Sequence, residues 1–179
     1  MRKAPGHYTN KYRVDLTASA ATFLELIDTR DFDLVFSHMF LEHVRTPLQV
    51  HRNIHSLLRS GGLAVHFYSS PYNVPLGLNR VLPEWVTTTM VRIAQPTRDF
   101  DGQLGKFPAY YKMCGNPSGA LHRIFESMGY RVLAHTGFVG HTYHDRFPIV
   151  RDIELSLRPL LVRFGIGMTS AQLIILQKL

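Results

Sequence analysis

The side chains most able to do chemistry in this chain of 179 residues stand together at Glu42 and His43. They lie in the segment Leu41–Val44, shortly after an apolar run at residues 32–37. A histidine side chain exchanges protons near neutral pH, so His43 is a candidate general base. Glu42 is a candidate for orienting the loop that carries it. The alternative is that His43 is a structural residue whose ring makes its hydrogen bonds within the protein.

Other histidines occur at spacings that suit a metal. His51 and His55 are four residues apart, but no glutamate follows His51 as in the His-Glu-x-x-His zinc motif. We therefore expect both to be exposed helix histidines. His141, His144 and Asp145 form a second group, which has no further ligands nearby in the sequence. The sequence thus predicts no metal site.

A strand–helix–strand unit is predicted to position Glu42 and His43. Residues 32–37 and 63–68 are short apolar runs, typical of strands buried on both faces. Between them, Thr46 can cap a helix, Pro47 suits its first position, and Gly61-Gly62 can end it. In open α/β sheets, ligands bind beyond the carboxyl ends of the strands. The site is therefore expected after residue 37 and after residue 68.

The remaining chain is predicted to add an insertion and further elements to one sheet. The insertion, residues 71–111, is rich in turn residues and is expected to cover the strand ends. The further predicted elements are a helix within the insertion at 86–94, a helix opened by Asn116-Pro117-Ser118, a strand at 130–139, a helix near 149–164 and a strand at 171–177. We expect a single domain over residues 1–179.

The segment FDLVFSHMFLEHVRTPLQVHRNIHSLLRSGGLAVHFYSSP closely resembles the methyltransferase type 11 branch of the class I S-adenosylmethionine-dependent methyltransferases. That branch has Phe-Asp-apolar-apolar-x-Ser, then Leu-Glu-His-Val, a helix begun by proline, and glycines before the next strand. The resemblance is looser further on, around residues 107–111, at Met128-Gly129-Tyr130 and in the last apolar run. It implies a Rossmann-like α/β fold.

The resemblance also implies a function and roles. It implies an S-adenosyl-L-methionine-dependent methyltransferase in which His43 is catalytic and Glu42 faces the acceptor. Residues implied against the cofactor are Asp15, Ser37, His38 and Met39, with Asp15 ending a strand at residues 12–14 and binding the adenine amino group. In the insertion, the candidate wall residues of the acceptor site are Tyr72, Tyr110, Tyr111 and Trp85, with ordinary core packing as the alternative for each. The acceptor is expected to be a small molecule, a lipid or a glycan.

One part of the family pattern is missing. The Asp-x-Gly-x-Gly-x-Gly loop is absent, since Gly6 is followed next by Gly61. We therefore expect an N-terminally truncated methyltransferase domain; a non-catalytic remnant or interaction module is the alternative. A different Rossmann-like enzyme is disfavoured by Leu-Glu-His-Val. The strand at 32–37 would then lack a neighbour, so we expect residues 12–16 to pair with it or the chain to self-associate through that edge.

The composition of the chain limits the partners and the cellular compartment that we expect. The net charge is +7, but the basic residues are scattered, and no nucleic-acid motif accompanies them, so no nucleic-acid partner is expected. Cys114 is the single cysteine, which fits a reducing cytoplasm. No apolar run approaches the ~20 residues that span a bilayer. The basic helix near 149–164 suggests contact with an anionic membrane surface, with core packing as the alternative.

Overall fold

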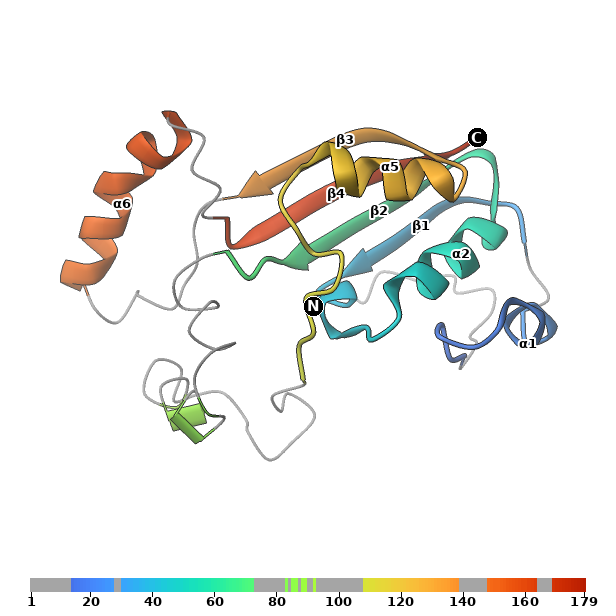
Figure 1. The fold of residues 1–179 in the computed structure, drawn as a ribbon, viewed down its shortest axis with the longest axis horizontal. Helices are drawn as coiled ribbons and strands as arrows, with labels where there is room; N and C mark the ends of the chain where they lie inside the picture. The colour runs from blue at the N-terminus through green and yellow to red at the C-terminus, as the bar shows by residue number, and fades with distance from the viewer. Residues whose placement is uncertain are drawn as a thin grey trace, which may run out of the picture.

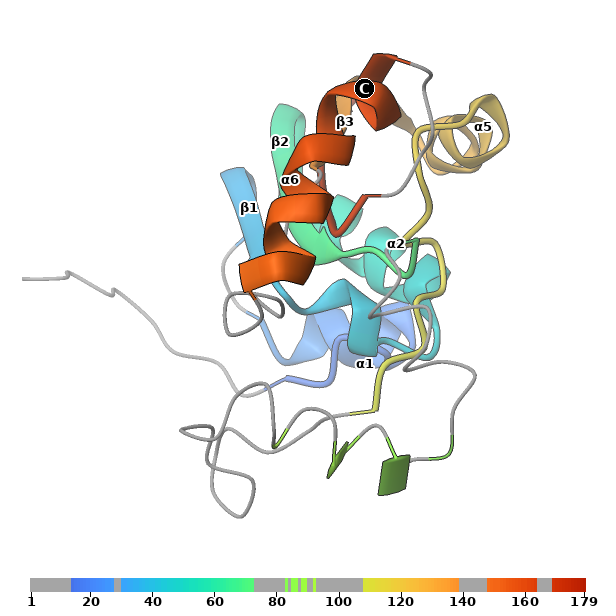
Figure 2. The ribbon, with the colours of Figure 1, turned by 90° about the vertical axis from the view of Figure 1, so that its left-hand side faces the viewer.

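A computed structural model describes residues 14–27, 30–72, 83, 85–86, 88–89, 92, 108–138, 148–163 and 169–179. These residues form one four-stranded sheet with helices against one of its faces (Figures 1 and 2). The helices on that face are α1 (Ala20–Glu25), α2 (Pro47–Leu57) and α5 (Gly119–Ser127). Helix α6 (Pro148–Arg163) lies beyond the carboxyl ends of β1, β2 and β3, away from both faces.

The sheet has the strand order β1-β2-β4-β3. β1 (Phe32–His38) and β2 (Leu58–Ser69) are parallel. β4 (Ala171–Lys178) is antiparallel to both of its neighbours, β2 and β3 (Tyr130–Phe138). The mixed α/β fold predicted from the sequence is therefore confirmed. The carboxyl ends of β1, β2 and β3 meet at one edge of the sheet, where the 3-10 helix η1 (Leu41–His43) follows β1.

The junction of α2 and β2 differs from the prediction. Helix α2 begins at Pro47, but Thr46 makes no side-chain cap hydrogen bond. The helix ends at Leu57 and β2 starts at the next residue, so Gly61 and Gly62 lie inside the strand. Gly61 has a φ of 77°, and a Cβ on Gly62 would stand 2.8 Å from the Phe32 carbonyl oxygen. The glycine pair therefore lets β2 bend past the start of β1 rather than ending the helix.

The core lies between the sheet and the helices. Alternate residues of the central strands point to this inner face, as Ala64 and Tyr68 do on β2 and Ile174 and Leu176 on β4, and all are at most 1% exposed. Helices α2 and α5 cover them with apolar side chains, namely Val50, Ile54, Leu121 and Phe125. The period-two pattern of strands and the helical spacing of apolar residues thus meet in one cluster.

The predicted elements after the insertion are confirmed with small shifts. Ser118 caps α5 by accepting a hydrogen bond from the Leu121 amide, and Gly129, with a φ of 88°, ends it. β3, α6 and β4 lie where the sequence predicts them. Within the predicted insertion, residues 85–86, 88–89 and 92 are helical, and most of 71–111 lies outside the described residues.

The prediction for residues 12–16 is wrong where the structure describes them. Residues 14–16 form no strand and instead lead into α1, which the sequence analysis did not predict. Val14 and Leu16 pack against the small cluster of Phe23, Ile27 and Leu57. These apolar contacts therefore hold residues 14–16 against α1 and the end of α2. Among the described residues, β1 pairs with β2 alone.

No helix in the described part of the chain is both long and apolar enough to cross a bilayer.

Candidate functional site

The centre of the candidate site is Glu42, which joins three segments at the carboxyl ends of the strands. Its Oε1 atom accepts hydrogen bonds from the Ser69 hydroxyl at 2.8 Å and the Ser69 amide at 3.2 Å. Its backbone carbonyl accepts from the amides of Tyr110 and Tyr111, at 2.7 and 3.1 Å. The side chain is 2% exposed. Glu42 therefore ties η1 to the end of β2 and to residues 110–111.

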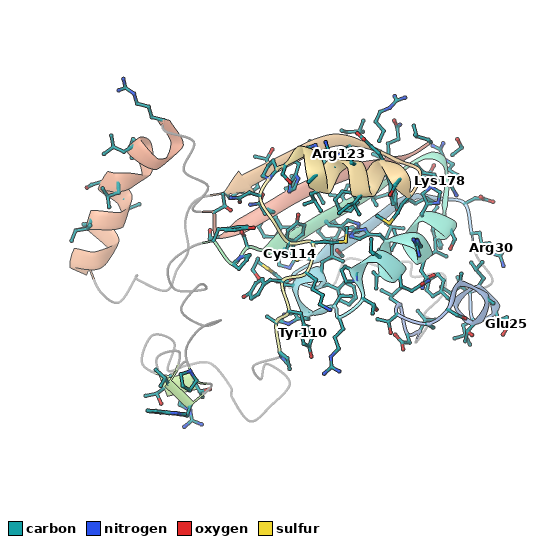
Figure 3. The ribbon with its side chains drawn as sticks, in the orientation of Figure 1. Glu25, Arg30, Tyr110, Cys114, Arg123 and Lys178 are labelled. Atoms are coloured by element: carbon teal, nitrogen blue, oxygen red, sulfur yellow. The ribbon has the colours of Figure 1, made fainter. Side chains whose placement is uncertain are left out.

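Glu42 lies in a buried polar environment. Its Oε2 atom is buried and has no hydrogen-bond partner among the described residues. Burial, followed by the charge of Glu42, raises the pKa of the Cys114 thiol. Burial also raises the pKa of Tyr68, with Cys114 and Glu42 adding to the effect. Both groups therefore stay protonated at neutral pH, and Cys114 is not a thiolate nucleophile. Figure 3 shows the segment of Tyr110 and Cys114 crossing the strand ends.

His43 is oriented by a backbone carbonyl. Its Nδ1 atom is 2.8 Å from the carbonyl oxygen of Pro108. Because a carbonyl can only accept, Nδ1 carries the proton in this hydrogen bond. In the neutral form of this tautomer the lone pair is on Nε2, so a general base at this position would act through Nε2. The sequence signal for His43 was the Leu-Glu-His-Val motif; the contribution of Pro108, sixty-five residues away, had no signal.

Residues 108–113 are held against the site from outside. The Arg45 Nε atom donates a hydrogen bond of 2.7 Å to the Tyr110 hydroxyl, and its guanidinium lies 5.1 Å from the centre of that ring. The Lys112 ammonium donates to the Arg45 carbonyl. Tyr111 and Met113 have φ values of 52° and 59°, a conformation that non-glycine residues seldom adopt. Arg45 and Lys112 are site residues that the sequence analysis missed.

Three of the four residues predicted against the cofactor, those at the end of β1, diverge in direction. Ser37 points to the inner face, where its hydroxyl is 2.8 Å from His66 Nδ1. His38 points to the other face and stacks on Phe67, with ring centres 5.3 Å apart. Met39 is 41% exposed and has a φ of 49°. Only the backbone turn at His38–Met39 is therefore presented beyond the end of β1.

Asp15 is engaged within its own turn, and the remaining predicted aromatics are largely exposed. Asp15 is exposed in the turn before α1, where its carboxylate accepts hydrogen bonds from the Thr17 hydroxyl and amide. These hydrogen bonds lower the pKa of Asp15. Tyr72 and Trp85 are 49% and 72% exposed. Of the predicted acceptor-side residues, the structure brings Tyr110 and Tyr111 to Glu42.

The expectation that His51 is an exposed helix histidine is wrong. His51 is 1% exposed and packs edge-on against His66 and Phe125, with ring centres 5.2 and 4.9 Å away. Burial, with a smaller effect of His66, lowers the pKa of His51 to about 3. Burial alone lowers the pKa of His66 to about 4. His55 is half-buried against Tyr130. The two helix histidines therefore serve the core.

Metal-binding groups are not assembled in the part of the chain that the structure describes. No cluster of three or more histidine, cysteine or acidic side chains there is arranged to hold an ion. His141, His144 and Asp145 lie outside the described residues.

A second buried polar cluster closes the strand ends between β2 and β3. Gln172 Nε2 donates to Asn116 Oδ1 and Thr169 Oγ1, each at 2.6 Å, and Thr169 also donates to the Ser70 hydroxyl. A side chain on Gly137 would collide with Thr169, since its Cβ would lie 2.4 Å from the threonine methyl group. This cluster fixes the start of β4 against the end of β2.

The described residues lack the groups that usually hold a nucleoside cofactor. Binding it requires a glycine-rich backbone cradle after a parallel strand and a carboxylate for the ribose hydroxyls. Neither β1 nor β2 is followed by glycine among the described residues. The polar side chains nearby are engaged, Ser37 with His66 and Glu42 with Ser69. The described residues therefore do not fit the nucleoside part of such a cofactor by themselves.

Comparison with known proteins supports the resemblance. Residues 2–66 match the protein family described as a methyltransferase domain. No curated protein matches the chain. The match covers β1, η1, α2 and most of β2, and therefore includes Ser37, Glu42 and His43.

Solved structures with a similar fold are methyltransferases in several cases. A SAM-dependent methyltransferase from Archaeoglobus fulgidus is 15% identical, with a TM-score of 0.46, over 90% of this chain and 66% of that one. One from Mesorhizobium loti is 14% identical, with a TM-score of 0.46, over 93% and 68%. The [4+2]-cyclase SpnF is 13% identical, with a TM-score of 0.43, over 92% and 54%. The chain thus spans between 54% and 68% of these three.

The strand–helix–strand unit that carries the candidate site is thus the part of the chain for which a family is recognised. Residues 2–66 match the methyltransferase domain, in agreement with the resemblance carried by the Phe32–Ser37 and Leu41–Val44 motifs.

Proposed function

We propose that this chain forms the acceptor-side wall of an S-adenosyl-L-methionine-dependent methyl-transfer site, with a small molecule, a lipid or a glycan as acceptor. The observation that carries the proposal is the anchoring of η1 by Glu42, which sets His43 beside the end of β1. The match of residues 2–66 to a methyltransferase domain supports it.

In this proposal, the chain contributes position and a proton acceptor. S-adenosylmethionine supplies an electrophilic methyl group when it is bound. Glu42 fixes the loop through Ser69, and the Pro108 carbonyl fixes the His43 ring. Nε2 of His43 would hold the proton released from the acceptor's O–H or N–H group, which would leave the acceptor atom's lone pair available for the methyl group. Orientation of this kind is a large part of the rate enhancement in bimolecular transfer.

The remaining assignments follow from the same proposal. Met39 and the backbone of His38 would border the methionine part of the cofactor, and Ser37 would act indirectly, through His66. Tyr110 and Tyr111 would cover the acceptor, held in place by Arg45 and by the Glu42 carbonyl. Asp15 would reach the adenine only if the turn that carries it were rearranged.

A non-catalytic interaction module is the second candidate. The lack of a glycine cradle after β1 and β2 in the described residues favours it. The two candidates can be distinguished by adding such a glycine loop to the chain and measuring cofactor binding and activity.

The test uses two proteins. The chain as it stands should bind S-adenosylhomocysteine at millimolar concentrations or not at all by calorimetric titration, because it offers one wall. A form extended at its amino end by a strand and a glycine loop of the Asp-x-Gly-x-Gly-x-Gly type should bind it in the micromolar range. In that form, His43→Ala should lower the turnover of methyl transfer to added acceptors at least tenfold and leave cofactor affinity within about twofold.

Two results would contradict the proposal. Micromolar binding by the unextended chain would place the cofactor on residues that we assign elsewhere. An extended form that folds and binds the cofactor, but whose activity is unchanged by His43→Ala, would leave His43 as a structural residue. Asp33→Asn, a change at an exposed residue on β1 that pairs with Arg59, serves as the matched control.

A further inference from the structure

Two cationic side chains lie together at the edge of the candidate site. The Lys112 ammonium donates a hydrogen bond of 3.0 Å to the backbone carbonyl of Arg45, sixty-seven positions away in the chain. Both side chains are exposed. The turn that carries Arg45 and the segment that carries Lys112 therefore bring two positive charges to one small region of the surface.

The Arg45 guanidinium is held at one of its edges. Its Nε atom donates to the Tyr110 hydroxyl at 2.7 Å, and its Cζ atom lies 5.1 Å from the centre of the Tyr110 ring. The two terminal nitrogens have no hydrogen-bond partner among the described residues. Arginine presents these nitrogens as a rigid fork that matches the oxygens of a phosphate or a carboxylate. Tyr110 thus orients the fork before any ligand binds.

The positive charge of this pair points to an anionic ligand. The ion pair recorded in the described part of the chain joins Arg59 to Asp33, at the opposite edge of the sheet. The Glu42 carboxylate is buried and accepts its hydrogen bonds from Ser69. An oxyanion beside Arg45 can accept hydrogen bonds from both cations and offset their mutual repulsion. The net charge of +7 adds a long-range attraction for such a ligand.

The pair also lies beside the residue that the proposed function uses as a proton acceptor. Arg45 follows His43 by two residues. Pro108, whose carbonyl orients the His43 ring, precedes Lys112 on the segment that crosses the strand ends (Figure 3). A molecule held by Arg45 and Lys112 is therefore tethered close to His43.

We propose that Arg45 and Lys112 bind a phosphate group of the methyl acceptor. This inference rests on the proposed function, and it narrows the acceptor to a phosphorylated molecule, either a sugar phosphate or a lipid with a phosphate headgroup. Phosphate is preferred to a carboxylate because it carries up to two negative charges and two cations meet it. The phosphate anchors the acceptor through a group that does not react, which leaves the reacting O–H or N–H group to His43.

The test titrates the chain as it stands with glucose 1-phosphate at constant ionic strength and follows binding by phosphorus NMR. Saturable binding is expected with a dissociation constant of about 0.1–1 mM, because charge-assisted contacts at an exposed site are screened by solvent. Unphosphorylated glucose, followed by proton NMR, should not bind. Arg45→Gln and Lys112→Gln should each weaken phosphate binding at least fivefold.

Two further variants serve as controls. Lys112→Arg keeps the charge and should bind the phosphate within about twofold of the wild type, which separates a loss of charge from a loss of folding. Arg59→Gln removes an exposed arginine at the other edge of the sheet and should also leave binding within about twofold. Circular dichroism confirms that each variant is folded.

Vesicles distinguish the two sources of phosphate. Co-sedimentation compares phosphatidylcholine vesicles with vesicles that also contain phosphatidic acid. Sedimentation that requires phosphatidic acid and is lost in Arg45→Gln, with glucose 1-phosphate bound only weakly, assigns the phosphate to a lipid headgroup. Tight binding of glucose 1-phosphate without any such sedimentation assigns it to a sugar phosphate.

Two results would overturn the phosphate site. One is the absence of both saturable glucose 1-phosphate binding up to about 20 mM and sedimentation that depends on phosphatidic acid. The other is binding that Arg59→Gln weakens as much as Arg45→Gln, which would show a general attraction to a basic surface. None of these titrations needs the cofactor or a glycine loop. Phosphate binding without methyl transfer by the extended form would therefore refute the proposed function alone, and methyl transfer without phosphate binding would refute this site alone.

Discussion

Glu42 connects the segments that form the candidate site. Its carboxylate is buried, accepts two hydrogen bonds from Ser69, and has no cation beside it among the described residues. A buried acceptor of this kind is retained where its geometry matters, since desolvating a charge is costly. The same residue anchors residues 110–111 through its carbonyl. Glu42 thus positions both His43 and the segment that covers it.

Two substitutions of Glu42 separate the contribution of its hydrogen bonds to stability from the contribution of its charge. Glu42→Ala should lower the free energy of unfolding by about 2–3 kcal/mol, because it leaves the Ser69 amide and hydroxyl unpaired in the interior. Glu42→Gln should change it by less than about 1 kcal/mol, because the amide oxygen keeps both hydrogen bonds. Urea denaturation at pH 7.5 measures both. Ser69→Ala, with an expected loss of about 1 kcal/mol, is the control; equal stability of Glu42→Ala and wild type would refute the anchoring role.

At the scale of elements, α2 and β2 meet through two buried imidazoles. His51 on α2 faces His66 on β2, and each has one ring nitrogen without a partner among the described residues. Both rings are neutral in the folded chain, because burial lowers their pKa values to about 3 and about 4. The helix–strand contact is therefore apolar in character at neutral pH but contains groups that acid can charge.

This pair predicts how stability depends on pH. An unfolded histidine takes up its proton near pH 6.5, whereas His51 and His66 in the folded chain resist protonation down to about pH 3 and 4. The unfolded state therefore binds more protons below pH 6.5, and stability falls as the pH falls towards those values. Between pH 7.5 and 5.0, the loss should be about 4 kcal/mol, or about 2 kcal/mol for each ring.

Urea denaturation at a series of pH values measures this loss. His66→Gln, which keeps a polar partner for Ser37 but does not titrate, should remove about half of it. His38→Gln, at an exposed ring, is the control and should leave the pH dependence unchanged. A flat profile from pH 7.5 to 5.0 in the wild type would show that the rings are accessible to protons in the folded chain.

For the whole molecule, the sheet is covered on one face by helices and presents apolar residues on the other. Core residues such as Tyr68 and Ile174 are buried within one copy, while Leu34 and Phe36 are not. β1 is also at the end of the sheet in the described structure. An unpaired edge of an apolar strand can pair with another chain. The self-association through the edge of β1 that the sequence predicts therefore stays a prediction, and it would link the stability of the fold to association.

That linkage has a thermal signature. If folded chains associate and unfolded chains do not, the melting temperature must rise with protein concentration. Calorimetric scans at 2 and 200 µM should differ by about 2–6 °C for the wild type. Phe36→Glu should melt at the same temperature at both concentrations, because a charge on an edge strand opposes pairing. A concentration-independent wild-type melting temperature would mean that association does not involve the folded state.

Much of this molecule is determined locally by its sequence. The apolar runs of β1 and β4, Pro47 at the start of α2 and the Ser118 cap of α5 each act within a few residues, and each was predicted. The motif Leu41–Val44 also makes Glu42 and His43 candidate site residues, because the residue types and their order after a strand can be read within one segment.

The tertiary structure decided what depends on residues far apart in the chain. The sequence alone predicted that His51 lies on an exposed helix face. In the fold, His51 is buried because His66 and Phe125 pack against it. The orientation of His43 depends on Pro108, and that of Glu42 on Ser69. Likewise, the alternation in β1 cannot tell which of its faces meets a helix. Burial and long-range hydrogen bonds are properties of the assembled fold, so no local pattern encodes them.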